Sequence, residues 1–129
     1  MLAAKDAMFN GGFVKFYTGP KPTNPDTALS SQVLLLTLNY AATAFSAPTI
    51  SGGFAVANGS FTSNSGTVGG SGTNTPVFAR AYESDGVTVI DDYTVGLTGS
   101  GSDFMFPTVT WSAGLVVTLS SDQNEEPVD

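Results

Sequence analysis

The sequence predicts an all-β protein: an antiparallel β-sandwich, with jelly-roll-like connectivity as one option, preceded by a short N-terminal helix. Two observations predict this class. About seven short segments rich in β-branched and aromatic residues follow one another, with glycine, proline, asparagine and aspartate between them. Threonine, serine and glycine together make up 45 of the 129 residues, which is typical of all-β virion and extracellular proteins.

The length of 129 residues predicts one domain, which we divide into three parts. Residues 1–12 form an N-terminal arm, residues 13–121 the β-sandwich, and residues 122–129 an acidic tail that we expect to be a solvated end. Within the arm, LAAKDAMF at residues 2–9 holds good helix formers, and NGG at residues 10–12 ends the helix as a glycine terminus does.

The first predicted strand, FVKFYTG at residues 13–19, alternates between two faces. Val14 and Phe16 point to one face, and the residues between them point to the other. The next stretch, GPKPTNP at residues 19–25, contains three prolines, which cannot sustain a hydrogen-bonded ladder. We therefore expect a rigid, extended loop there.

The middle of the chain contains the best core candidate and the weakest pattern. SQVLLLTLNY at residues 31–40 has a continuous apolar run, which indicates a strand covered on both faces. One or two brief strands are expected around residues 54–61. Residues 62–75 are glycine-rich and uncharged, and we expect a long mobile loop or an edge segment that orders only against a partner.

A hairpin is predicted at YESDGVTVID, residues 82–91. Asp85 and Gly86 tolerate the positive φ that both central residues of a type I′ turn require. The preceding strand alternates, with Phe78, Arg80 and Tyr82 on one face, and the turn should set a register that places Phe78, Tyr82 or their neighbours in the sandwich interior. The remaining strands are expected at residues 104–106 and 114–121, after a turn at residues 98–103.

The composition excludes several classes of function. The chain has no cysteine and no histidine, so it lacks a disulfide framework, a zinc site of the cysteine type and the commonest general base. Its net charge of −7 repels nucleic-acid backbones. No apolar run approaches the roughly 20 residues needed to cross a bilayer, and the N-terminus lacks a secretory signal, so we expect synthesis in the cytoplasm and no membrane partner.

The carboxylates Asp85, Asp91, Asp92 and Asp103 are the only candidates for a metal site or catalysis. They lack the D-x-D-x-D-G spacing of calcium loops, so turn formation and solvation explain them better. Glu83 with Asp91 or Asp92 offers a pair of acids for glycoside hydrolysis, but one tryptophan gives little material for a sugar cleft. We expect no enzyme activity, no metal and no cofactor.

The order of several motifs resembles that of a family of small virion proteins from tailed bacteriophages. The motifs are FNGGFVKFYTGPKPTNPDTAL from residue 9, FARAYESDGVTVIDDYTVG from residue 78, SGSDFMF from residue 100 and AGLVVTLSS from residue 113. The resemblance runs from about residue 2 to residue 121. It implies a structural component of the virion, associated with the head.

The first functional hypothesis is therefore a capsid decoration, or cement, protein. It would bind the outer capsid surface as a dimer or trimer and bridge copies of the major capsid protein. The expected contacts are Leu2, Met8 and Phe9 of the arm and Pro20, Pro22 and Pro25 of the loop. Deletion of residues 1–11 should then leave a folded sandwich.

Arg80, the single arginine, is a further candidate contact. On an alternating strand it is either an interface anchor that forms a bidentate salt bridge or a residue that faces solvent. The alternative function, a receptor- or glycan-binding module of a fibre or head spike, would use Trp111, Tyr93 and the loop at residues 62–75.

Overall fold

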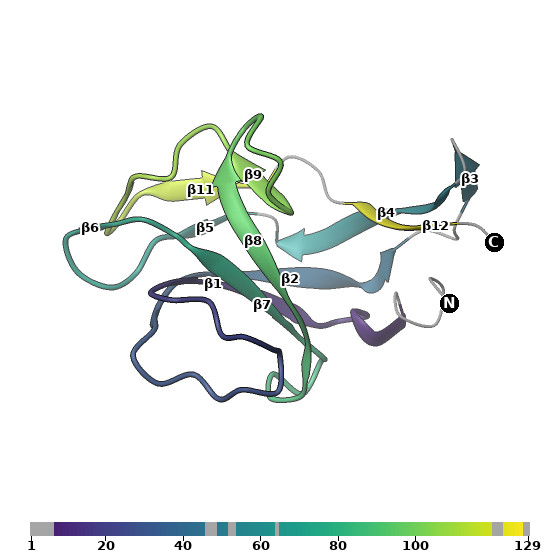
Figure 1. The fold of residues 1–129 in the computed structure, drawn as a ribbon, viewed down its shortest axis with the longest axis horizontal. Helices are drawn as coiled ribbons and strands as arrows, with labels where there is room; N and C mark the ends of the chain where they lie inside the picture. The colour runs from purple at the N-terminus through teal and green to yellow at the C-terminus, as the bar shows by residue number, and fades with distance from the viewer. Residues whose placement is uncertain (1–6, 46–48, 52–53, 64, 120–122, 128–129) are drawn as a thin grey trace.

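The protein is all-β, as the sequence predicts (Figure 1). The computed structural model describes residues 7–45, 49–51, 54–63, 65–119 and 123–127. Its strands are β1 (Phe13–Thr18), β2 (Val33–Phe45), β3 (Thr49–Ser51), β4 (Phe54–Ser63), β5 (Ser65–Thr67), β6 (Thr73–Asn74), β7 (Phe78–Tyr82), β8 (Val89–Leu97), β9 (Phe104–Phe106), β10 (Trp111–Ser112), β11 (Val116–Thr118) and β12 (Gln123–Pro127). Most of the helix predicted at residues 2–9 lies outside the described residues. Ala7 and Met8 are helical and lead into a turn.

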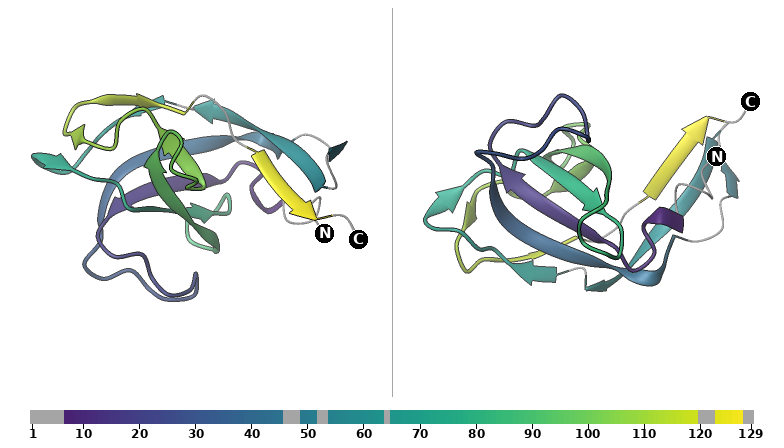
Figure 2. Two further views of the ribbon diagram at one scale, coloured as in Figure 1. Left: turned by 45° about the horizontal axis from the view of Figure 1, so that its top comes forward. Right: turned by 90° about the horizontal axis from the view of Figure 1, so that it is seen from below.

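One large sheet dominates the fold, and it curls (Figures 1 and 2). Its strand order is β12-β4-β2-β1-β7-β8-β9, with β3 paired to β4. All of its pairs are antiparallel except β8 with β9, which run parallel. Two small sheets, β10-β6 and β11-β5, complete the sandwich-like arrangement.

The main core lies on the inner face of the curled sheet. Phe16 of β1 is fully buried there, and its ring lies edge-on to Phe104, Phe106 and Trp111 at centroid distances of 5.4, 5.5 and 5.9 Å. Strands from the beginning and the end of the chain therefore share one core. The alternation predicted for β1 is confirmed, because Val14 and Phe16 are both in this cluster.

The outer face of β1 and β7 carries a second buried layer. Tyr17 stacks on Phe78 with ring centroids 5.3 Å apart, and the hydroxyl oxygens of Tyr17 and Tyr82 lie 3.0 Å apart within hydrogen-bonding distance. We expected Phe78, Tyr82 or their neighbours in the sandwich interior. Of these residues, the neighbours Ala79 and Ala81 reach the main core, while Phe78 and Tyr82 are buried on the opposite face.

This second layer is covered by the proline-rich loop, residues 19–32, which joins β1 to β2. The loop reaches β7, because Nη1 of Arg80 donates a hydrogen bond to the carbonyl oxygen of Thr27 at 2.9 Å. The side chains of Arg80 and Asp92 beneath it are only 3% and 1% exposed. The loop thus buries polar and aromatic groups that would otherwise face solvent.

The β7–β8 connection forms a hairpin, but not through the predicted two-residue turn. Among the described residues only glycines have positive φ, so Gly86 (φ 72°) adopts it and Asp85 does not. The Asp85 carboxylate instead accepts hydrogen bonds from the backbone N–H groups of Val87 and Thr88, both at 2.8 Å, as in an Asx turn. The Thr88 hydroxyl and these backbone donors lower the pKa of Asp85.

Strand β12 replaces the solvated end that we expected at the C-terminus. Its residues pair with the first half of β4, from Gln123 opposite Asn58 to Pro127 opposite Phe54. Strand β3 pairs with the same part of β4. These three strands extend away from the rest of the sheet (Figure 2), and the second half of β4 connects them to β2.

The segment at residues 62–75, for which we expected a mobile loop or an edge that awaits a partner, pairs within the chain. Its strands β5 and β6 pair with β11 and β10. Between them Val68 is buried in the main core, and its N–H donates to the carbonyl oxygen of Leu115 at 2.8 Å. Burial of this one apolar side chain helps to fix a segment whose composition indicates a loop.

Candidate functional site

The candidate carboxylates do not converge on one site. Asp92 binds Arg80, and Asp103 accepts hydrogen bonds from the backbone and hydroxyl groups of Thr94. Asp85 is engaged by its own turn, and Asp91 accepts a hydrogen bond from the backbone N–H of Asp92. In the part of the chain that the structure describes, no group of three or more Asp, Glu, His or Cys is placed to hold a metal ion.

The described residues include no helix with the length and apolar character needed to span a membrane.

The predicted contact residues of the N-terminal arm have different environments. Leu2 lies outside the described residues, and Met8 is 39% exposed. Phe9 is 1% exposed and packs edge-on against Tyr40 and Phe45, at centroid distances of 5.3 and 5.2 Å. The choice of Phe9 as a surface contact was therefore wrong, because its ring is needed to fill the core at the end of β2.

This packing also corrects the expectation that residues 1–11 are dispensable for folding. Asn10 accepts a hydrogen bond through its side-chain oxygen from the Ala44 N–H at 2.9 Å, and the Gly11 N–H donates to the Ala41 carbonyl at 2.9 Å. Together with Phe9, these bonds fasten the arm to β2. Deletion through residue 11 would remove part of the core.

Arg80 is neither a free interface anchor nor a solvent-facing residue. Its Nε and Nη2 bind the two carboxylate oxygens of Asp92 at 2.6 and 2.9 Å, and its Nη1 binds the Thr27 carbonyl. The hydrogen bond to Asp92 is the main cause of the raised pKa of Arg80. The bidentate pair was foreseen for a partner molecule, but it forms within the chain, where it joins β7, β8 and the proline-rich loop.

The proline-rich loop is the best candidate for a contact surface. Besides Arg80, it is held by Gln32, whose side-chain nitrogen donates to the Pro20 carbonyl at 2.7 Å, and by Asn24, whose oxygen accepts from the Asp26 N–H at 3.0 Å. Among its three prolines, Pro20 is exposed, and Pro22 and Pro25 are half-buried. An irregular segment fixed by bonds within the chain keeps its exposed groups in one arrangement.

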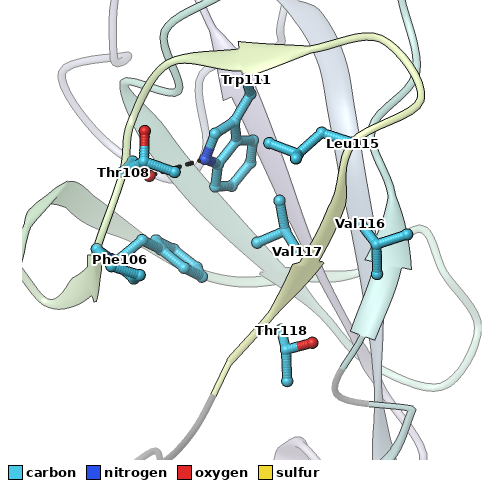
Figure 3. A pocket seen from close by; sticks show the side chains of 8 residues that line it. Phe106, Thr108, Trp111, Leu115, Val116, Val117 and Thr118 are labelled. Atoms are coloured by element: carbon cyan, nitrogen blue, oxygen red, sulfur yellow. Dashed lines mark hydrogen bonds between the residues drawn. The ribbon is translucent and has the colours of Figure 1, made fainter.

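A small apolar hollow lies between β11 and the segment that follows β9 (Figure 3). Its volume is about 110 Å³, and it is lined by Phe106, Pro107, Thr108, Trp111, Leu115, Val116, Val117 and Thr118. Ligand pockets usually enclose about 300–1,000 Å³, so this hollow is too small for a sugar chain.

The aromatic residues named for glycan binding do not form an open platform. Trp111 is fully buried, and its indole N–H donates to the carbonyl oxygen of Thr108 at 2.9 Å. Tyr93 is half-buried and packs edge-on against Phe104 of the core, with ring centroids 5.6 Å apart. Neither ring offers the exposed face on which a sugar stacks.

Neither Asp92 nor Thr27 was predicted from the sequence as a partner of Arg80. The signal for Asp92 was present, since an arginine and an aspartate occupy the two strands of one predicted hairpin. Thr27 carried no such signal, because its backbone carbonyl is the acceptor and any residue supplies that group.

Comparisons of the chain with protein-family models, with curated proteins and with solved structures gave no match. The resemblance to small virion proteins of tailed bacteriophages therefore stays a prediction.

Proposed function

We propose that the protein is a capsid decoration protein of a tailed bacteriophage, which binds the outer surface of the head and bridges major capsid subunits. The observation that carries this proposal is the proline-rich loop, which is irregular, largely exposed and yet fixed to the sheet through the buried Arg80. A contact segment that is already ordered loses little conformational entropy on binding. Adhesion through a preformed surface is the task of a cement protein.

Binding to a capsid also requires only modest affinity from each individual contact. Capsid subunits repeat by symmetry, so a bridging protein meets the same surface at many positions and gains from several simultaneous contacts. The exposed part of the loop includes Pro20 and Lys21, and the same part would make each of the repeated contacts.

Co-sedimentation with heads that lack the protein tests the proposal. The purified chain should sediment with the heads, and a variant with residues 20–25 replaced by a Gly-Ser segment of equal length should not. Val87→Asp is the matched control, because Val87 is 76% exposed and lies in the β7–β8 hairpin loop, outside the proline-rich loop. Melting curves establish that both variants are folded.

Failure of the unaltered chain to sediment with heads would contradict the decoration role. Equal sedimentation of the loop variant would leave the role intact but would show that the loop is not the contact. Copy number in purified particles gives an independent check. A decoration protein is present in hundreds of copies, whereas a fibre or spike component is present in far fewer.

A further inference from the structure

The outer face of the sheet is covered by the proline-rich loop only in part. The loop bonds to Arg80 of β7 above the buried pair that Arg80 forms with Asp92 of β8, whereas β11 and β5 lie apart from it in Figure 1. On the neighbouring strands β2, β5 and β11, the side chains that point outward include Leu34, Thr37, Ser65, Thr67, Val116 and Thr118. We refer to these six residues as the bare face. Leu34 is 43% and Val116 65% exposed.

Strand register shows that these side chains share one side. A Cβ added to Gly66 would meet the core residues Leu36 and Leu38, so position 66 faces inward and its neighbours on β5 face outward. Val116 is opposite Thr67, and Thr118 is opposite Ser65.

The β2 part of the bare face lies on the same side. Leu34 is opposite Tyr17, which belongs to the outer layer. Leu34, Thr37 and Thr67 also line a single open hollow, which joins β2 to β5.

The bare face is also free of charge in a protein that is strongly acidic. Residues 27–79 and 104–121 contain no Asp, Glu, Lys or Arg, and all three strands fall within these ranges. The nearest charge along the register is Lys15, opposite Thr37. Its ammonium group lies 4.8 Å from the centroid of the Tyr82 ring on β7, on the side away from β2.

We propose that the bare face is the contact between two copies of this chain. Each copy carries a net charge of −7, so approach through most of the surface places like charges together. The bare face is where two identical copies meet without that cost, with sheet packed on sheet. A two-fold axis along β5 sets Leu34 of one copy against Val116 of the other and brings the two Thr67 side chains together.

The area of the proposed contact is small, which limits the affinity of the dimer. Three strands spaced about 4.8 Å apart offer an area on the order of a few hundred Å², less than the roughly 800 Å² per partner of a standard interface. The dimer is therefore weak and concentration-dependent. It depends on the surface of the free chain and not on the decoration role, so failure of capsid binding would leave it standing.

Sedimentation equilibrium tests the dimer. The unaltered chain should associate as the concentration rises, and the association should strengthen with salt, because salt screens the repulsion between the acidic copies. Val116→Asp and Leu34→Asp should each weaken the association by about tenfold or more, since they bury an unpaired charge. The matched control is Val87→Asp, which adds the same charge at a 76% exposed valine outside the bare face.

Cross-linking gives a second readout that does not depend on affinity. The chain has no cysteine, so Thr67→Cys places a single thiol at the two-fold axis and should yield a covalent dimer under mild oxidation. Val87→Cys should not. A chain that stays monomeric up to roughly millimolar concentration, or equal cross-linking by both variants, would overturn the proposal.

Discussion

Arg80 and Asp92 form a bidentate ion pair beneath the proline-rich loop, with contacts of 2.6 and 2.9 Å. Their side chains are 3% and 1% exposed, so each charge depends on the other for the interactions that water would otherwise provide, and the guanidinium depends also on the Thr27 carbonyl. The pair therefore ties the loop to the strands that carry it.

Asp92→Asn should lower the free energy of unfolding by about 3–5 kcal/mol, because it leaves the guanidinium buried without its counter-charge. The double variant Arg80→Met/Asp92→Leu should recover most of this loss. Urea denaturation measures both changes. Asp26→Asn is the control at an exposed carboxylate in the same loop, and it should change the free energy by less than about 0.5 kcal/mol. Similar small changes for Asp26 and Asp92 would show that the pair is not a structural support.

Phe9→Ala should cost about 3–5 kcal/mol, because it removes the ring that packs between Tyr40 and Phe45. Met8→Ala, at the adjacent and 39% exposed position, should cost well under half as much. Guanidinium unfolding of the two variants gives the comparison. Equal losses would place the arm outside the core.

Gly86→Val should destabilise the protein by about 1 kcal/mol or more, because Gly86 has a φ of 72°. A Cβ at this position would meet only the ring of Phe13 at 4.0 Å, so the cost is in the backbone conformation and not in a clash. Gly86→Asn should cost less, since asparagine tolerates this conformation better. Thermal melting of both variants measures the difference, and a stable valine variant would refute the turn described here.

Alkaline pH should destabilise the protein through Tyr17. Burial, and then the hydrogen bond with the Tyr82 hydroxyl, raise the pKa of Tyr17 above its ordinary value of 10.0. The raised pKa favours the neutral phenol in the folded state, so its contribution to stability is complete below about pH 10 and is lost as the pH rises further.

The free energy of unfolding should therefore fall more steeply above pH 10 for the unaltered chain than for Tyr17→Phe, which has no phenol to ionise at that position. At neutral pH the substitution should cost about 1 kcal/mol, because it removes the bond to Tyr82. Parallel pH curves for the two proteins would contradict the assignment.

The local sequence pattern was sufficient to locate the strands that have a clear alternation or a continuous run of apolar residues. Val14 and Phe16 reach the core because side chains alternate along a strand, and that property requires only neighbouring residues. The run at β2 was likewise identified as a strand from its continuous apolar residues, but the expectation that it is covered on both faces was wrong, because Leu34 and Thr37 on its outer face are exposed. The turn at Gly86 was located correctly, but its type depended on the hydrogen bonds of the Asp85 side chain.

The register between β7 and β8 could not be predicted from the local sequence pattern. A two-residue turn centred on Asp85 and Gly86 would place Arg80 opposite Asp91. The structure has an irregularity in the pairing between Ala81 and Tyr82, which shifts the strands by one residue and sets Arg80 opposite Asp92. Because a shift of one residue changes the face to which a side chain points, the buried ion pair follows from the bulge.

The sequence by itself determined the all-β class, the absence of cysteine and histidine chemistry, and the acidic charge, because these depend on composition and on periodicity over a few residues. Only the tertiary structure decided that Phe9 and Arg80 are internal, that the proline-rich loop covers β7, and that β2, β5 and β11 form an uncharged face. Each of these depends on contacts between residues far apart in the chain, such as Arg80 with Thr27, which no local pattern specifies.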